Sequence, residues 1–303
     1  MAALRDKKIL VTGLTGSVGY PVARRLAADN EVWGAARFSS ARRRARLEEA
    51  GITCAEIDLV VADFGALPDD FDYVLNFAVL HPPDFDTALA ANAEGIGLLM
   101  AHCRRATAVL HCSSTGVYQP DGAHPFKESD PLGDNHRAAG LTTYSISKIA
   151  AEAVVRCTAR MLDIPTTIAR LNVPYGDSWG WPRMHAEMMA AGTDIALHTE
   201  EPNVFNPIHE DDILGLIPGL LDAAAVPVTV VNWAGPDTVS AEEWCRYVGS
   251  IIGAEPHFTR TPAAISSVAV DATRMVELIG PARVDWKEGF RRMAEDLLAS
   301  RSR

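Results

Sequence analysis

Tyr144 and Lys148 lie four residues apart in the stretch Tyr-Ser-Ile-Ser-Lys. Around them Ile146, Ile149 and Ala153 recur at spacings of three and four, which predicts a helix from residue 145 onward. Residues four apart share one helix face, so the phenol and the ammonium would face the same space. A nearby cation favours the phenolate and lowers the pKa of a tyrosine from about 10. The pair is therefore a candidate proton-transfer centre, although a surface Tyr–Lys pair would have the same spacing.

A glycine-rich turn, Thr12–Gly19, follows the first predicted strand and precedes a helical pattern over 20–28. Strand, glycine turn and helix together are typical of dinucleotide binding. Gly13 would permit the tight turn, Gly16 would let the backbone approach a pyrophosphate, and Gly19 would allow the helix to pack closely on the strand. The amides at the helix N-terminus would then face the phosphates. We expect cofactor contacts from Gly13, Thr15, Gly16, Ser17, Val18 and Gly19.

The second predicted strand, Glu31–Ala36, should end near the adenine ribose of the cofactor. NAD-binding proteins usually place Asp or Glu there, about 20 residues after the loop, to bind the 2′-hydroxyl. Here Arg37 and Ser39 follow the strand, and an arginine is a bidentate partner for a 2′-phosphate. We therefore expect NADP(H), with Arg37 as the main phosphate contact and Ser39 beside it. The alternatives are NAD as cofactor and an Arg37 that is only solvated.

Predicted strands and helices alternate through the first part of the chain, which favours a parallel sheet with helices on both faces. We expect a Rossmann-type, doubly wound α/β fold with a smaller C-terminal substrate lobe. The nucleotide-binding domain would comprise residues 1–175 and 206–235, and the lobe residues 176–205 and 236–303. The further strands are expected at 52–57, 73–78, 108–112, 166–170 and 228–232, and helices at 86–105, 150–162 and 241–252.

Composition narrows the class of protein. A net charge of −11 over 303 residues argues against nucleic-acid or membrane-surface binding, which both require basic patches. The most apolar stretch, Ile213–Val231, is broken by two prolines and an aspartate, so no membrane span is expected. Five scattered cysteines and no signal peptide indicate a cytoplasmic protein. The run His209-Glu-Asp-Asp212 lacks the spacing of metal ligands, so no metal is expected.

These motifs together resemble the extended short-chain dehydrogenase/reductase family, which includes epimerases and dehydratases. They occur in family order: T-G-x-x-G-x-x-G at 12–19, Asp58-Leu59, Asn92 in a helix, S-S-T-G-V-Y at 113–118, Y-x-x-x-K at 144–148, Tyr175-Gly176, and Ile208-His209 with Asp212. The resemblance implies cofactor contacts from Asp58, Leu59, Ala78 and Lys148, and a homodimer through the helices of Asn92 and Tyr144.

The resemblance also implies catalytic roles. Tyr144 would be the general acid/base, and Lys148 would bind the nicotinamide ribose and lower the pKa of the tyrosine. Ser114 would hydrogen-bond the substrate oxygen, although Ser113 or Thr115 could take its place. Asn92 would support the lysine, or would serve only in helix packing.

This sequence departs from the family pattern at positions that would contact the substrate. Relatives that act on sugar nucleotides usually have R-x-x-N-V-Y-G-P, and Val173 stands here at the position of that asparagine. Phe205 stands where they have an arginine for the diphosphate, so an apolar ring replaces the charge. Thr115 and Gly116 replace the Asp and Glu of dehydratases, so sugar dehydration is not expected. The expected substrate contacts are Ser114, Thr115, Tyr144, Val173, Trp179 and Phe205.

The sequence thus predicts an NADP(H)-dependent oxidoreductase that transfers hydride to or from a small carbonyl or alcohol without a nucleotide. One alternative is an NAD-dependent sugar epimerase that retains its cofactor. Another is a non-catalytic protein that senses dinucleotides. A sensor would not need the Tyr144–Lys148 pair, whose presence therefore favours an enzyme.

Overall fold

The computed structural model describes residues 4–135 and 141–301. The chain forms two compact units. The first comprises residues 1–114, 146–170 and 216–231, and the second comprises residues 115–145, 171–215 and 232–303. This division differs from the expected domain boundaries chiefly at 115–145, because Tyr118 and Phe126 in that stretch are buried in the core of the second unit.

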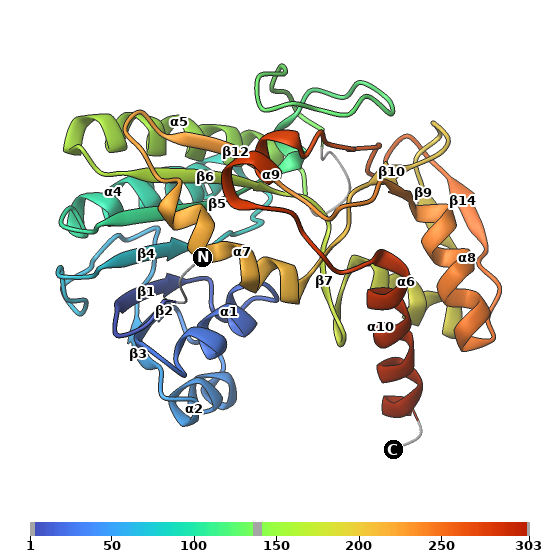
Figure 1. The fold of residues 1–303 in the computed structure, drawn as a ribbon, viewed down its shortest axis with the longest axis horizontal. Coiled ribbons are helices and arrows are strands. Elements are labelled where there is room, and N and C mark those ends of the chain that lie inside the picture. Colours follow the sequence, from blue (N-terminus) through green and yellow to red (C-terminus); the bar gives the residue numbers. More distant parts are fainter. Residues whose placement is uncertain (1–3, 136–140, 302–303) are drawn as a thin grey trace. The chain divides into compact units, whose positions relative to one another are not determined.

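A seven-stranded sheet in the order β12-β6-β5-β4-β1-β2-β3 forms the centre of the first unit (Figure 1). The strand order reverses between β1 and β4, as in doubly wound folds. The Rossmann-type fold predicted from the alternating pattern is confirmed. The strands are β1 (Lys8–Thr12), β2 (Glu31–Ala36), β3 (Thr53–Glu56), β4 (Tyr73–Asn76), β5 (Ala108–Ser114), β6 (Thr166–Leu171) and β12 (Thr229–Trp233).

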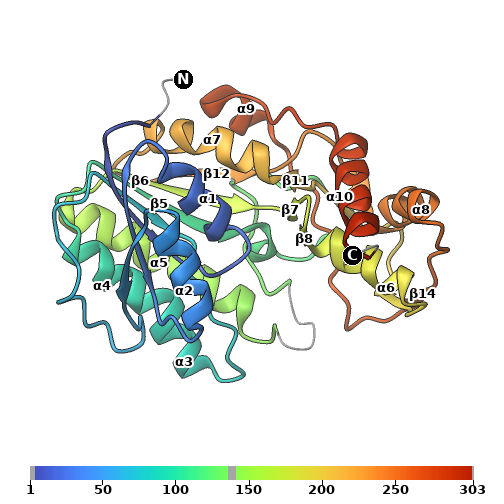
Figure 2. The same cartoon turned by 90° about the horizontal axis from the view of Figure 1, so that it is seen from below.

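Helices cover the sheet of the first unit, and α4 (Gly95–His102) lies beside α5 (Tyr144–Leu162) (Figures 1 and 2). The two helices approach closely at Gly97, where a Cβ atom would lie 2.5 Å from Cγ1 of Val154. Leu99 of α4 and Val155 of α5 are buried with Val109 of β5 in one hydrophobic cluster. The other helices of this unit are α1 (Gly19–Leu26), α2 (Ala41–Glu49) and α3 (Phe85–Leu89).

The helix predicted over 86–105 is interrupted by a π-helical turn. This turn, η1 (Ala90–Glu94), separates α3 from α4 and has the buried Asn92 at its centre. A π turn shifts the hydrogen-bond pattern of a helix from i+4 to i+5 and often marks a functional site. The predicted helical stretch is confirmed over 85–102, and the π turn within it was not predicted because the period of apolar residues carries no signal for one inserted residue.

The second unit packs α6 (Trp181–Ala190), α8 (Ala241–Ile252) and α10 (Trp286–Arg301) around an aromatic core (Figure 2). Trp244 lies 6.1 Å from Phe290 between ring centroids. Ser240 accepts a 3.1 Å hydrogen bond from the backbone N–H of Glu243 and so caps the N-terminus of α8. Helix α7 (Glu210–Asp222) begins in this unit, and its residues from 216 onward belong to the first. The remaining elements are β7 (Pro174–Gly176), β8 (Trp179–Gly180), β9 (Ile195–Leu197), β10 (Val204–Phe205), β11 (Ile208–His209), β13 (Val239–Ser240), β14 (Phe258–Arg260) and α9 (Thr273–Ile279). Of the helices within 4–135 and 141–301, none combines the length and apolarity needed to cross a membrane.

Candidate active site

The glycine turn between β1 and α1 is shaped by two close backbone approaches. Gly13 has a φ of 68°, and a Cβ atom there would lie 2.5 Å from the backbone N of Ala78. At Gly19 a Cβ atom would lie 2.5 Å from the carbonyl oxygen of Gly13. Glycine is therefore required at both positions. Within the described ranges no side chain caps the N-terminus of α1, and the N–H of Tyr20 donates to the carbonyl oxygen of Gly16 at 3.1 Å. The positive end of the helix dipole at this terminus favours a phosphate.

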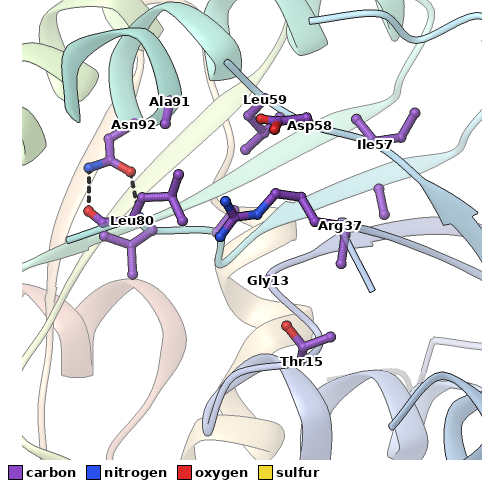
Figure 3. A pocket seen from close by; sticks show the side chains of 13 residues that line it. Gly13, Thr15, Arg37, Ile57, Asp58, Leu59, Leu80, Ala91 and Asn92 are labelled. Atoms are coloured by element: carbon purple, nitrogen blue, oxygen red, sulfur yellow. Dashed lines mark hydrogen bonds between the residues drawn. The ribbon is translucent and has the colours of Figure 1, made fainter. Parts of the chain in front are cut away.

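A pocket lies beyond the carboxyl ends of β1 to β4, where doubly wound sheets bind ligands (Figure 3). Six predicted cofactor residues line it: Gly13, Thr15, Arg37, Asp58, Leu59 and Ala78. Asn92 and Ala35, Ala36, Ile57, Val79, Leu80 and Ala91 also line it. The lining does not include Gly16, Ser17, Val18 and Gly19, which belong to the loop beside it, nor Ser39 and Lys148. Sequence reasoning missed Val79 and Leu80, although their place directly after a strand was a usable signal.

The residue of this pocket that follows β2 is an arginine, where NAD-binding proteins usually have an acid. Arg37 extends from the end of β2 into the pocket with its guanidinium directed toward Leu80 (Figure 3). Asp58 also lines the pocket, but its carboxylate accepts a 2.9 Å hydrogen bond from the backbone N–H of Val60 and so stabilises a turn. Arg43 of α2 donates to the carbonyl oxygen of Thr15 at 3.3 Å. The glycine cradle, the positive end of the α1 dipole and these cations fit a dinucleotide.

Asn92 joins the pocket to α5. Its Oδ1 accepts a 2.8 Å hydrogen bond from the N–H of Leu80, and its Nδ2 donates to the carbonyl oxygen of Leu80 at 2.9 Å (Figure 3). The same Nδ2 lies 3.1 Å from Oγ of Ser147 on α5. Asn92 thus holds the pocket-lining segment after β4 to the residue next to Lys148, which is consistent with its predicted supporting role.

Lys148 is buried and anchored to the end of β5. Its Nζ donates a 2.8 Å hydrogen bond to the carbonyl oxygen of Cys112. Burial lowers the pKa of the Lys148 ammonium, and the charges of Cys112 and Glu152 oppose that shift. Tyr144 is the first residue of α5, one turn before Lys148, and is assigned to the second unit.

The three neighbouring hydroxyl groups at the end of β5 differ in their partners. Ser113 Oγ donates a 2.7 Å hydrogen bond to Glu152. Thr115 Oγ1 donates to the carbonyl oxygen of Leu171 at 3.5 Å. Ser114 faces the opposite side of β5 from Ser113, because successive side chains of a strand alternate. A substrate contact by Ser114 stays a prediction.

A buried polar ladder crosses the ends of three strands and was missed by the sequence analysis. Thr12, Asn76 and His111 lie opposite one another in the register of β1, β4 and β5. Thr12 Oγ1 donates to Asn76 Oδ1 at 2.5 Å, and Asn76 Nδ2 lies 2.9 Å from His111 Nδ1. Burial lowers the pKa of His111 to about 3, so the ring is neutral. Since Nδ1 accepts, the proton is on Nε2, which has no hydrogen-bond partner in the described part of the chain.

The predicted substrate residues of the second unit have structural partners. Trp179 Nε1 donates a 2.5 Å hydrogen bond to Glu210. Phe205 is only 2% exposed and its ring lies 5.0 Å from that of Trp181, because the aromatic core encloses it. Val173 packs partly buried against the same core. Substrate contacts by these residues stay predictions. The described residues contain no group of three or more His, Cys, Asp or Glu arranged to hold a metal ion.

The glycine turn at the carboxyl edge of a doubly wound sheet fits a dinucleotide-binding protein. Residues 9–206 match the sequence model of the NAD dependent epimerase/dehydratase family. The chain belongs to this family and is an NAD-dependent enzyme. A search of curated proteins gave no significant match.

Solved structures with the same fold cover nearly the whole chain. The UDP-glucuronic acid 4-epimerase from Bacillus cereus in complex with NAD has 18% identity and a TM-score of 0.80, covering 96% of this chain and 99% of its own. The UDP-N-acetylglucosamine 4-epimerase from Methanobrevibacter ruminantium has 17% identity and a TM-score of 0.81, covering 98% and 100%. The dTDP-glucose 4,6-dehydratase from Bacillus anthracis, in complex with NAD, has 16% identity and a TM-score of 0.82, covering 98% of each.

Proposed function

We propose that this enzyme oxidises and reduces a secondary alcohol carbon, with Tyr144 as the proton acceptor and donor. The observation that carries the proposal is Lys148, anchored at the end of β5 and one helical turn after Tyr144. The ammonium favours the phenolate form of Tyr144, which then takes the hydroxyl proton of the substrate. Ser114 donates a hydrogen bond to the oxygen on which charge develops. The nicotinamide supplies hydride transfer when it is bound.

The first candidate for the overall reaction is epimerisation. Family membership and the 4-epimerase neighbours support it. The hydride removed in the first half-reaction would return to the opposite face of the same carbon, so the cofactor would stay bound and no external oxidant would be consumed. Here Tyr144 would first accept the proton and then return it. The contacts around Lys148 are the same for both half-reactions, since the lysine only holds charge and position.

The test for epimerisation is the cofactor content of the purified enzyme. We expect NAD(H) to be released on denaturation and identified by its absorbance and by mass spectrometry. The enzyme should then interconvert a sugar nucleotide from a panel of UDP- and dTDP-sugars without added cofactor. A protein that purifies empty and turns over only with added NADPH would contradict this candidate.

The second candidate is an NADP(H)-dependent reductase of a small carbonyl compound, and the position of Arg37 in the pocket favours it. If Arg37 binds the 2′-phosphate, the Arg37→Asp variant loses a charge-assisted contact and gains repulsion. We expect its Kd for NADPH to rise about tenfold to a hundredfold while its Kd for NADH changes little. Fluorescence titration measures both. Arg46→Asp, on the exposed face of α2, is the matched control and should leave both constants unchanged. Equal effects on NADPH and NADH would contradict a 2′-phosphate contact.

We also propose that a second copy of the chain covers an apolar surface of α4 and α5. Leu98 is 51% exposed and Met161 is 77% exposed on these helices. We expect a dimer in light scattering at micromolar concentration, and a monomer for the Leu98→Glu, Met161→Glu double variant, because charge in an apolar interface is costly. Phe85→Glu, on α3, is the control for added surface charge. A monomeric wild-type protein would contradict the proposal.

A further inference from the structure

Glu152 is a buried carboxylate at the centre of a hydrogen-bonded cluster in the first unit. It is 1% exposed, and both of its oxygens receive donors. Arg170 of β6 binds it with Nε at 2.9 Å and Nη2 at 2.8 Å, as a bidentate fork. Ser113 Oγ donates at 2.7 Å and Arg156 Nη2 at 3.1 Å. Burial opposes its ionisation, but the hydrogen bonds and charge of Arg170 hold the pKa of Glu152 below its usual value.

Glu152 and Lys148 connect the same helix to the same strand. They lie one turn apart on α5, and their partners on β5 are consecutive residues: Lys148 binds the carbonyl oxygen of Cys112, and Glu152 binds the hydroxyl of Ser113. Ser114 is the next residue of the strand. Two polar contacts at this spacing fix both the axial position and the rotation of α5 on β5, which one contact alone would leave free.

Stability alone is a weak explanation for this arrangement. Desolvating a buried ion pair costs about as much as its attraction returns, and apolar residues of similar size often serve as well. A buried pair is better explained where it selects one geometry among several. The Arg170–Glu152 pair fixes the carboxylate, so that Oε1 can accept a hydrogen bond only from a hydroxyl placed as that of Ser113 is.

We propose that Glu152 is a positioning residue: through Ser113 it sets the register of α5 on β5, so that Lys148 and Ser114 are held in one working geometry. The inference rests on the proposed hydride-transfer function. Ser113 then does not contact the substrate, because its hydroxyl donates to Glu152, and it acts by holding α5 to β5.

The test uses Ser113→Ala, which removes the contact to β5 and leaves the Arg170–Glu152 pair in place. We expect kcat to fall about tenfold to a hundredfold, as for a small misplacement of reacting groups, with the Kd for the cofactor nearly unchanged. Ser113→Thr keeps the hydroxyl and should restore most of the activity. Glu152→Gln combined with Ser113→Ala should be no slower than Glu152→Gln alone, because both changes break the same contact.

The matched control is Thr167→Val. Thr167 also has a buried hydroxyl on a strand of this unit, and it donates a 2.7 Å hydrogen bond to the carbonyl oxygen of Leu220, away from α5. This variant should lose stability comparable to that lost by Ser113→Ala and retain the wild-type kcat. An equal loss of kcat in both variants, or none in Ser113→Ala, would overturn the proposal.

Amide hydrogen exchange in the cofactor-free protein gives a readout that needs no turnover. We expect faster exchange at residues 112–114 and in the first turns of α5 for Ser113→Ala, and wild-type exchange there for Thr167→Val. Unchanged exchange in Ser113→Ala would contradict the positioning role even if the wild-type protein proved inactive on every substrate tried. Inactivity of the wild-type protein with altered exchange in the variant would instead refute only the proposed function.

Discussion

Replacing Tyr144 with phenylalanine should lower turnover by about two to four orders of magnitude, the usual contribution of a general acid/base. The variant lacks the hydroxyl that exchanges the proton and keeps the ring. Because the pocket proposed for the cofactor is lined by residues between 13 and 92, the Kd for NAD(P) should stay near that of the wild-type enzyme. Single-turnover kinetics and fluorescence titration measure the two quantities separately.

The matched control for this prediction is Tyr247→Phe. Tyr247 packs its ring on Trp286 at 5.3 Å between centroids, a contact that phenylalanine preserves. We expect wild-type turnover for this variant. Near-normal turnover in Tyr144→Phe, or an equal loss in both variants, would refute the assigned mechanism.

Replacing Arg170 with methionine should lower the free energy of unfolding by about 3–5 kcal/mol, because it leaves the buried carboxylate of Glu152 without its main partner. Urea denaturation at neutral pH measures the loss. Arg156→Met is the control, since Arg156 binds the same carboxylate from a side chain that is 39% exposed. Such a partly exposed pair contributes less than about 1 kcal/mol. Similar losses in the two variants would contradict the central place of Arg170.

The same cluster makes the wild-type stability depend on pH with a definite sign. The pKa of Glu152 is lower in the folded protein than in the unfolded chain, where it is about 4.3. Its contribution to stability is therefore complete above that value and is lost as the pH falls through the folded pKa. In Arg170→Met the pKa of Glu152 in the folded protein is no longer lowered by the arginine. Acidification from pH 7 to pH 4 should therefore reduce the free energy of unfolding less in this variant than in the wild-type protein.

Local pattern predicted the bounds of single elements in both units. β2 and α8 begin and end at the predicted residues, because a short run of apolar residues and a serine N-cap act within a few positions of the chain. The unit boundary at 115–145 was not predictable in this way. It depends on Tyr118 and Phe126 finding a core built from residues far along the chain.

The candidate site could be predicted at positions where the residue type and its spacing leave few other interpretations. Gly13 and the Tyr144–Lys148 spacing carry such a signal, since few other residues could do the same chemistry. The partners of Glu152 carried none, because a glutamate four residues after Lys148 reads as an ordinary helix former until Arg170 and Ser113 are seen beside it. Phe205 was recognised as a departure from the family pattern, but its enclosure at 2% exposure depends on long-range packing.

The ladder of Thr12, Asn76 and His111 constrains how this sequence can diverge. Each member satisfies a buried polar atom of its neighbour, so changing one alone leaves another unpaired at a cost of about 1–3 kcal/mol. Replacing all three by apolar residues of similar shape removes their own polar atoms together and leaves only the backbone N–H of Ala78, which donates to Thr12 Oγ1 at 3.3 Å, without its acceptor. Lineages that depart from this sequence should therefore exchange the three positions as a set, and intermediates carrying a single change should be rare.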